Sequence, residues 1–320
     1  MNLKDRFNLR KGGILLMKEW SLEMSDGVVV YAYSRQPEGT PVGHIHILHG
    51  MEEHSGRYES SADFFVKQGY IVTGHDHRGH GRTAEMNGKR GHFADKNGFN
   101  RVVEDAYEVI SFMKDEYPTR KFILLGHSMG SFIARRFIQL YGYLVDLVVL
   151  SATGDDGGVA RYAGQAIGHI MGRKAGYAQQ NKLLDALVFG SFNRGIKKPS
   201  TKFDWISKNN TLVFTYINDE FCGFIPTTQF FLDLFSGLGL IHNTKEIART
   251  PKRLPILLFG GTEDPVGNNG KALWKVAKQY EKAKIEDVTV LLFEGGRHEL
   301  LGDSTRKEVI QAVLEWIEKR

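Results

Sequence analysis

Short apolar runs alternate with longer amphipathic segments along most of this chain of 320 residues. Apolar runs of about four to eight residues are typical of buried strands, and apolar residues three and four positions apart are typical of helices that bury one face. The pattern predicts an opening hairpin of residues 20–24 and 28–33, and strands at 44–48, 70–74, 122–125, 147–150, 256–259 and 288–293. It predicts helices at 60–68, 98–117, 131–141, 271–281 and 304–319, and a polar loop from 75 to 97. Strands alternating with helices indicate an α/β fold, with a mostly parallel central sheet flanked by helices on both faces.

The alternation stops between residues 152 and 226, where small residues, amphipathic segments and basic residues mix. A single core usually stops growing at about 250–300 residues, so one large domain with an insertion is expected for a chain of this length. An insertion after a strand is the natural position for a lid over a site at the strand ends. We therefore expect a core of residues 17–151 and 227–320, and a cap, or lid, of residues 152–226.

Residues 1–16 carry basic side chains before an apolar run that is too brief for the apolar region of a secretory signal. The segment Lys11-Gly12-Gly13 can be encoded by AAA-GGA-GG, a ribosome-binding sequence of bacteria, and Met17 follows after three more codons. We therefore expect Met17 to be the native start of a bacterial protein, and residues 1–16 to be a translated leader.

Charge and cysteine content narrow the possible partners. The 42 basic and 37 acidic residues are interspersed and give a net charge of +5, which favours a solvated surface and no nucleic-acid partner. The single cysteine, Cys222, cannot form an intrachain disulfide and is typical of a reducing compartment, so we expect a cytoplasmic protein. We interpret the basic residues at 194–202 as a solvated face; weak contact with an anionic membrane surface is the alternative.

The segment Gly126-His127-Ser128-Met129-Gly130 has the G-x-S-x-G spacing of a nucleophile elbow, a sharp turn between a strand and a helix. Glycines two residues before and after the serine are needed because the turn is too tight for side chains at those positions. An apolar strand precedes this segment and an amphipathic helix follows it, which is the context that the motif requires. We therefore predict that Ser128 is a catalytic nucleophile.

A serine hydroxyl needs a neighbouring base to take its proton, and in folds with this elbow an acid and a histidine follow the serine along the chain. Asp264 comes shortly after the strand at 256–259, and His298 comes shortly after the strand at 288–293. Both therefore fall at the carboxyl ends of strands, at the edge of the sheet where Ser128 also lies. We predict that His298 is the base and that Asp264 orients it; Glu263 is the alternative acid.

The oxyanion of an acyl-transfer intermediate is stabilised by two backbone N–H groups, one after the nucleophile and one from a loop after an early strand. Met129 follows the nucleophile, and His49-Gly50-Met51 forms the early loop, in which Gly50 lets the backbone approach the substrate closely. We predict that the N–H groups of Met51 and Met129 form the oxyanion hole, and that the side chains of both residues line the pocket.

The segment His75-Asp76-His77-Arg78-Gly79-His80 permits a different interpretation, because H-x-H-x-x-H after a strand resembles a zinc-binding pattern. The aspartate expected directly before the last histidine of that pattern is missing, since Gly79 stands there. We favour a structural role, bracing the loops around the oxyanion hole, and expect no metal and no other cofactor. Cys222 could serve as a thiol nucleophile but lacks a partner motif, so we expect a small buried residue.

Taken in order, these motifs resemble those of the monoacylglycerol lipase and lysophospholipase-like α/β-hydrolases, also grouped as Hydrolase_4 or serine aminopeptidase S33-like. The resemblance rests on HGMEEHSGRY (49–58), HDHRGHG (75–81), GHSMG (126–130), GTED (261–264) and GRH (296–298), and extends from about Val28 to the end. It implies the α/β-hydrolase fold, a cap after the sixth strand, and a scaffold role near the site for Glu53, His54, Arg57 and the 75–81 loop. A serine rather than an aspartate at the elbow removes the haloalkane dehalogenase and epoxide hydrolase branches.

Two features depart from the family pattern. Glu52 stands where mammalian lipases have glycine, and the insertion lacks a strongly apolar helix of the kind that docks on membranes. We expect a serine carboxylic-ester hydrolase that cleaves monoacylglycerols, lysophospholipids or similar single-chain acyl substrates through an acyl-enzyme. The alternatives are a short-chain carboxylesterase, or an acyltransferase or peptidase with the same triad; a complete triad argues against a non-catalytic binding protein.

Overall fold

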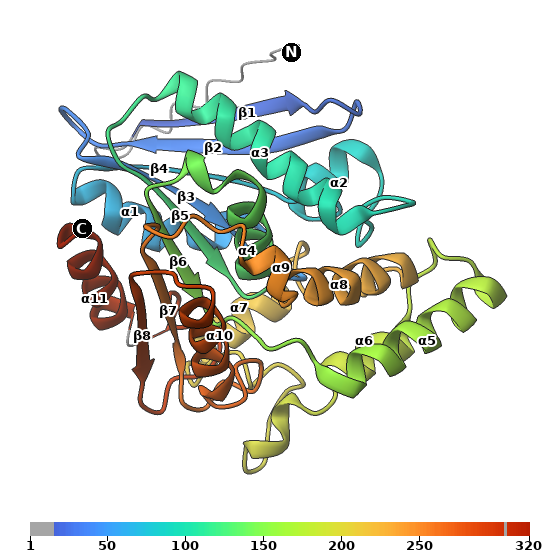
Figure 1. The fold of residues 1–320 in the computed structure, drawn as a ribbon. Helices are drawn as coiled ribbons and strands as arrows, with labels where there is room; N and C mark the ends of the chain where they lie inside the picture. Colours follow the sequence, from blue (N-terminus) through green and yellow to red (C-terminus); the bar gives the residue numbers. More distant parts are fainter. Residues whose placement is uncertain (1–15, 304–305) are drawn as a thin grey trace.

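A sheet of eight strands forms the centre of the described residues, which are 16–303 and 306–320 of the computed structural model (Figure 1). The strand order is β1-β2-β4-β3-β5-β6-β7-β8. The first two strands form an antiparallel hairpin, β2 is antiparallel to β4, and every other neighbouring pair is parallel. The strands are β1 (Leu16–Glu23), β2 (Val29–Gln36), β3 (Gly43–Leu48), β4 (Tyr70–His75), β5 (Phe122–His127), β6 (Leu147–Ser151), β7 (Ile256–Gly261) and β8 (Val288–Phe293). The predicted hairpin and mostly parallel sheet are thus confirmed.

Helices cover both faces of this sheet, as the alternating pattern predicted (Figure 1). One face packs against α1 (Glu59–Lys67) and α11 (Arg306–Glu318) through a core that includes Phe65 and Val313. The other face packs against α3 (Gly98–Glu116), α4 (Met129–Tyr141) and α10 (Lys271–Lys282) through a core that includes Val102, Ile133 and Val276. Because β3 to β7 are buried along their whole length, their near-continuous apolar sequence is what a parallel sheet covered on two faces requires.

The prediction for residues 75–97 is wrong in one respect. Residues 75–97 do not form a continuous loop, because α2 (Gly81–Asn87) lies within them. The helix is short and weakly apolar, so its sequence carries little helical periodicity; its first turn is held from outside instead, where the Asp76 carboxylate accepts the backbone N–H of Arg82. Thr83 and Ala84 lie on the buried face of this helix.

Helices replace the alternating pattern after β6, in the region expected to be a cap (Figure 1). They are α5 (Gly158–Ala175), α6 (Lys182–Phe189), the 3-10 turn η3 (Phe192–Gly195) and α7 (Asn210–Asn218). The sequence pattern did not separate α8 (Thr228–Ile241) and α9 (Thr244–Ile247) from the stretch before β7. Since α8 contacts α5 on one side and α3 and α4 on the other, it joins the two groups of helices. The division of the chain at residues 152 and 226 stays a prediction.

Two features fall partly outside the described residues. Of the expected leader 1–16, Leu16 alone is described, as the first residue of β1. Of the expected helix 304–319, residues 306–318 form α11. Short 3-10 turns also occur at Ser55–Tyr58 (η1) and Gly142–Leu144 (η2).

Candidate active site

Ser128 occupies the turn between β5 and α4 with a backbone φ of 51° and ψ of −119°, a combination that side-chain-bearing residues rarely adopt. Its N–H donates to the carbonyl oxygen of Ser151 on the neighbouring strand β6, at 2.9 Å. A side chain at Gly126 would collide with the carbonyl of Gly130, and one at Gly130 would collide with the carbonyl of Leu48. The two glycines therefore let the turn close so tightly that Ser128 is left at the end of the strand.

His298 and Asp264 meet in the loops that follow β8 and β7. The Nδ1 of His298 lies 3.0 Å from Oδ1 of Asp264, which also accepts the backbone N–H of Val266 at 3.0 Å. Only 4% of His298 and 1% of Asp264 is exposed. Because a carboxylate accepts hydrogen bonds, Nδ1 carries the ring proton and Nε2 is left with its lone pair. Glu263 is half exposed and pairs with Lys208 instead.

Two opposing effects set the proton affinity of His298. Burial alone lowers its pKa, but the Asp264 carboxylate, through charge and hydrogen bond, raises it, and the carboxylates of Glu299 and Glu53 act in the same direction. The net result is a pKa above the ordinary histidine value. The surroundings therefore stabilise the imidazolium, which is the form that a base reaches after taking a proton.

Ser128 and His298 open into one cavity of about 230 Å³. Its walls are mainly apolar and come from both the core and the region after β6; they include Phe132, Val188, Phe189, Phe192, Leu234 and Phe235. The ring of Trp205 lies 4.9 Å from the ring of His298, centroid to centroid, and closes the cavity on that side. Such a space favours an apolar group next to the serine and keeps water scarce.

Met51 and Met129 also line this cavity. Met51 follows Gly50 in the loop after β3, and Met129 is the first residue of α4, whose N-terminal amides favour negative charge. A Cβ at Gly50 would lie 3.2 Å from the Cβ of Ser128, so this loop passes directly beside the serine. The geometry thus gathers the serine, the histidine and two amide-bearing residues at one edge of the sheet.

A buried ion-pair cluster supports the loop from below. Oε1 of Glu53 accepts the backbone N–H of Gly50 at 2.5 Å and the hydroxyl of Tyr58 at 2.7 Å. Arg57 joins Glu53 to Glu299, donating to the latter through both terminal nitrogens. Burial raises the pKa of Glu53, but the charge of Arg57 and the hydrogen bond from Tyr58 outweigh it and lower the pKa to about 2. Glu53 therefore stays ionised and holds Gly50 in place.

The family model described as Hydrolase_4, serine aminopeptidase S33, matches residues 39–305, most of this chain. The chain belongs to this family. The monoacylglycerol lipase of Mycolicibacterium smegmatis is 28% identical over 284 residues, 88% of this chain and 90% of that protein. The human monoglyceride lipase is 27% identical over 301 residues, 92% of this chain and 89% of that protein. The resemblance inferred from the motifs is thereby confirmed.

Solved structures agree with the fold of this S33-family hydrolase. A thermostable carboxyl esterase from Bacillus coagulans, in complex with glycerol, superposes with a TM-score of 0.88 at 27% identity, over 95% of this chain and 98% of that one. A structure described as a lipase in its open form superposes with a TM-score of 0.84 at 24% identity, over 95% of this chain and 98% of that one. The α/β-hydrolase fold is confirmed.

The zinc interpretation of the 75–80 histidines gains no support in this hydrolase. Their imidazoles bond to one another and to the backbone rather than converging on one point. In the part of the chain that the structure describes, the grouping whose ligand atoms lie close enough for a metal is His54, Asp219 and Cys222, within 4.8 Å of one another. There His54 already pairs with Asp219 at 3.0 Å, and burial raises the pKa of the Cys222 thiol, which disfavours a thiolate ligand or nucleophile.

Sequence reasoning missed several residues around the site. Trp205 and Glu299 carry no motif of their own, and the partner of Glu299, Arg57, is 242 positions away along the chain. His127, in contrast, was predicted as part of the elbow motif, and it is buried beside His298 and contacts the Ser151 hydroxyl at 3.0 Å. The one available signal was adjacency, since Glu299 directly follows the candidate base.

Proposed function

We propose that this chain hydrolyses carboxylic esters of single-chain acyl substrates, such as monoacylglycerols or lysophospholipids, through an acyl-enzyme on Ser128. The observation that carries the proposal is the buried contact between His298 and Asp264, at 3.0 Å, beside a serine in the elbow conformation. The esterase and lipase names of the relatives support the same reaction class.

In the first half of the reaction, Nε2 of His298 takes the proton of the Ser128 hydroxyl as its oxygen attacks the ester carbonyl carbon. The carbonyl oxygen becomes an oxyanion, for which the N–H groups of Met51 and Met129 are the proposed donors. Asp264 keeps the ring proton on Nδ1 and stabilises the imidazolium. The imidazolium then protonates the leaving alcohol, and the acyl group stays on Ser128.

In the second half, water takes the place of the alcohol. His298 removes a proton from the water, whose oxygen attacks the acyl carbon and forms a second oxyanion in the same position. Collapse of this intermediate returns the proton to Ser128 and releases the fatty acid. An alcohol or amine in place of water would give acyl transfer, and a peptide in place of an ester would give peptidase activity, so these alternatives concern the acceptor or leaving group and not the triad.

Hydrolysis of p-nitrophenyl esters from acetyl to palmitoyl, together with a 1-monoacylglycerol, tests the proposal. Activity that peaks on medium or long chains and includes the glyceride is the expected result, because the cavity wall is apolar. Ser128→Ala should lower kcat at least about 10⁴-fold without changing the thermal unfolding temperature. Activity confined to acetyl and butyryl esters would instead establish the short-chain carboxylesterase, and no ester hydrolysis at all would refute the proposal.

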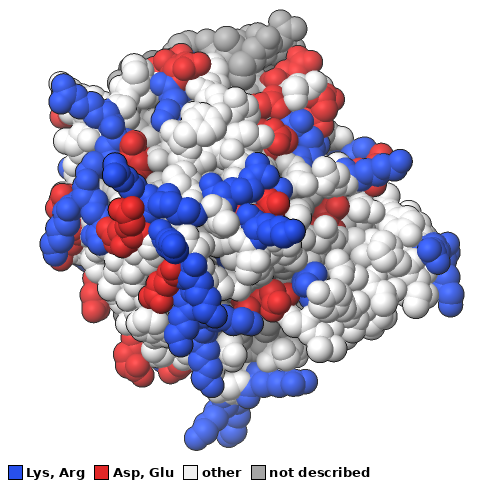
Figure 2. All heavy atoms as spheres, in the orientation of Figure 1, with Lys and Arg blue, Asp and Glu red and all other residues white. Residues whose placement is uncertain are grey.

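Weak contact between the cap and an anionic membrane surface is part of the same proposal. Exposed apolar side chains lie along α5 and α6, and include Val159, Tyr162, Ile170, Leu183 and Leu187. The exposed Arg194, Lys197, Lys198 and Lys202 follow α6 along the chain. Basic side chains gather at the lower edge of the view in Figure 2. Exposed apolar side chains combined with exposed basic side chains favour the headgroup region of anionic lipids.

Sedimentation with vesicles tests this contact. More protein should pellet with vesicles that contain phosphatidylglycerol than with pure phosphatidylcholine, and Lys197→Glu together with Lys198→Glu should reduce the difference. Equal sedimentation with both compositions would contradict it. Within the described residues no helix is long and apolar enough to cross a membrane.

A cytoplasmic location in a bacterium completes the proposal. It rests on the single cysteine and on the mycobacterial relative. Fractionation of the native host, followed by detection of the protein in the soluble cytoplasmic fraction, would support this location; recovery from the medium would contradict it.

A further inference from the structure

Four buried histidines contact one another in sequence, from the middle of the sheet to the loop that carries Met51. Nε2 of His46 on β3 lies 3.0 Å from Nδ1 of His75 on β4, and Nε2 of His75 lies 3.1 Å from Nδ1 of His77. His77 contacts His49 twice, because its Nε2 lies 3.2 Å from the His49 carbonyl oxygen and its backbone N–H donates to Nε2 of His49 at 2.9 Å. Each of the four is 0% exposed. We call His46, His75, His77 and His49 the histidine chain.

Backbone groups that contact His49 and His77, at one end of the histidine chain, determine which nitrogen of each imidazole ring carries the proton. A neutral imidazole has one donor nitrogen and one acceptor nitrogen. Nε2 of His49 accepts a backbone N–H, so its proton is on Nδ1, which lies 2.7 Å from the carbonyl oxygen of Gly50 and donates to it. Nε2 of His77 faces a carbonyl oxygen, which can only accept, so His77 carries its proton on Nε2 and accepts at Nδ1.

The same reasoning extends to the other end. His75 must donate from Nε2 to His77, and therefore accepts at Nδ1 from Nε2 of His46. The Nδ1 of His46 then accepts from the hydroxyl of Thr73 at 2.8 Å, and that hydroxyl accepts from Nε2 of His44 at 2.7 Å. Burial lowers the pKa of each of these histidines, that of His75 to about 3, so the rings stay neutral. Every hydrogen bond thus runs in one direction, toward the loop.

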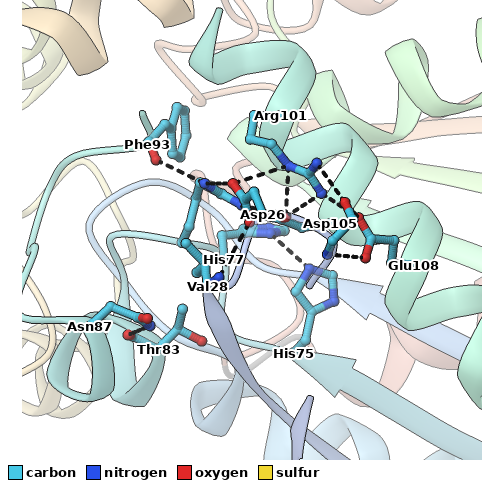
Figure 3. A network of polar contacts seen from close by, with 12 residues as sticks. Asp26, Val28, His75, His77, Thr83, Asn87, Phe93, Arg101, Asp105 and Glu108 are labelled. Carbon is cyan, nitrogen blue, oxygen red and sulfur yellow. Dashed lines mark hydrogen bonds and ion pairs between the residues drawn. The ribbon is translucent and has the colours of Figure 1, made fainter. Parts of the chain in front are cut away.

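The segment around His77 is itself held rigidly. Arg78 donates to the buried carboxylate of Asp105 on α3, from Nε at 2.5 Å and from a terminal nitrogen at 2.6 Å. Figure 3 shows the contact between His75 and His77 beside the ion-pair network of Asp26, Arg101 and Asp105. The backbone next to His77 is therefore held in place by buried ion pairs.

The two contacts of His49 bear on the proposed oxyanion donor. The Gly50 carbonyl and the Met51 N–H belong to one planar trans peptide, in which the two groups point in opposite directions. Since Nδ1 of His49 holds the carbonyl, the N–H of the same peptide points away from His49, and both Gly50 and Met51 line the cavity. The preceding peptide is held as well, because its carbonyl contacts His77 and its N–H donates to Glu53.

We propose that the histidine chain fixes the orientation of the Gly50–Met51 peptide, so that His49 is a positioning residue for the Met51 N–H in oxyanion stabilisation; this rests on the proposed function. His49 acts through the backbone and does not line the cavity. A rotated peptide would present the Gly50 carbonyl where the developing negative charge needs a donor.

The proton positions can be measured directly. Two-bond ¹H–¹⁵N correlation spectra of the wild-type protein, labelled with ¹⁵N-histidine, should show His46, His75 and His77 protonated on Nε2 and His49 protonated on Nδ1. A proton on Nε2 of His49, or on Nδ1 of His77, would overturn the proposal. This measurement needs no substrate, so it stays decisive even if the wild-type protein hydrolyses no ester, a result that would refute the proposed function itself.

Two substitutions at His49 test the consequence for catalysis. His49→Leu removes the donor to the Gly50 carbonyl and should lower kcat for a p-nitrophenyl ester about 10- to 100-fold, with KM changed less than about two-fold, since losing one oxyanion donor outright costs about 10²–10³. His49→Asn keeps an N–H near the position of Nδ1 and should recover most of kcat. If His49→Leu fails to fold, the Asn variant and the spectra still decide.

The matched control is His92→Leu. His92 is also a buried histidine with two side-chain partners, Thr227 and Asp95, but it lies outside the histidine chain. It should keep the wild-type kcat. Equal kcat in the wild type and in His49→Leu, or equal losses in His49→Leu and His92→Leu, would overturn the proposal.

Discussion

The edge of the sheet that carries the candidate residues and the helices that follow β6 differ in how much of their surface is buried. Ser128, Asp264 and His298 each lie in a short turn after a strand of one sheet, and the last two are almost fully buried. Helix α5, in contrast, buries only Gly164, Gly168 and Gly172 and exposes apolar residues to solvent.

The glycines of α5 explain how this helix is attached. Gly164, Gly168 and Gly172 are four positions apart and form one face of the helix. A Cβ at Gly164 or Gly168 would lie 2.7 Å from Phe235 or Leu232 of α8, so the two helices meet with backbone against side chain. The close approach depends on the absence of side chains at these glycines, and a hydrogen bond from the Arg161 guanidinium to the Phe235 carbonyl adds to it.

This contrast teaches a division of roles. Groups proposed for chemistry are fixed by strands, buried charges and hydrogen bonds, whereas the helices after β6 add apolar wall to the cavity. Substitutions at the sheet edge should therefore change kcat and its pH dependence, and substitutions in the helices should change KM and chain-length preference.

Among the substitutions that test this division of roles, Asp264→Asn should have the largest effect. An amide would hold the wrong tautomer of His298, and kcat should fall about 10³- to 10⁴-fold with little change in KM, as steady-state kinetics would show. Glu263→Gln is the matched control, because Glu263 is adjacent in sequence but half exposed. It should keep the wild-type kcat; a large loss there would shift the role of the acid to Glu263.

The pH profile comes next. His298 must be neutral to act as a base, and the Asp264 carboxylate overcomes the effect of burial and raises its pKa. kcat/KM should therefore rise about tenfold per pH unit in acid and level off at a midpoint above the ordinary value of about 6.5. A midpoint below that value would contradict the assignment of His298.

A smaller effect, on KM, is expected from the glycine face. Gly168→Leu should push α5 away from Leu232 and raise KM for long-chain esters about tenfold, while kcat for acetyl esters stays within about two-fold. Ala166→Leu, on the exposed face of the same helix, should change neither. A loss of kcat for acetyl esters in the Gly168 variant would break the proposed division of roles.

The smallest effect is expected at Glu52, which lies in the loop after β3 and interacts with Asp185 on α6. Burial raises the pKa of Glu52 well above its usual range, and Asp185 on α6 adds to the shift. The folded state thus holds a proton that the unfolded state releases, and stability falls as pH rises from the ordinary carboxyl pKa toward the raised one. Glu52→Gln should be more stable than the wild type at pH 8 by about 1 kcal/mol, or about 2 °C.

Thermal unfolding at two pH values checks this expectation. The difference in unfolding temperature between Glu52→Gln and the wild type should disappear near pH 4, where the Glu52 carboxyl is protonated and therefore as neutral as the Gln amide. Glu23→Gln, an exposed position on β1, should show no difference at either pH. A Gln variant less stable than the wild type at pH 8 would show that Glu52 is ionised in the folded protein.

The sequence predicted most of the sheet and the three residues proposed as the triad because each prediction needed only neighbours along the chain. The strands are apolar runs, and the candidate residues follow them directly in short glycine-containing turns. The triad roles themselves stay predictions that the variants above will test.

What the sequence did not predict depends on contacts between distant residues. Helix α2 is stabilised by β2, because the Thr83 hydroxyl accepts the backbone N–H of Tyr31, and Arg57 contacts Glu299 only after the chain has folded. The histidine chain joins residues of β3 and β4 that pair in the sheet, and its order cannot be inferred from spacing. The hydrophobic pattern along the chain predicts individual helices and strands, whereas polar contacts between them can be identified only in the folded structure.

The backbone of Ser128 has a consequence for how such a protein could change over time. Its φ of 51° carries a conformational cost of about 1–3 kcal/mol that only glycine avoids. Ser128→Gly would therefore yield a chain that is inactive yet harder to unfold. In this sequence the serine therefore occupies a backbone position where glycine would be the less strained residue, which is expected where the demands of a reaction and of stability compete.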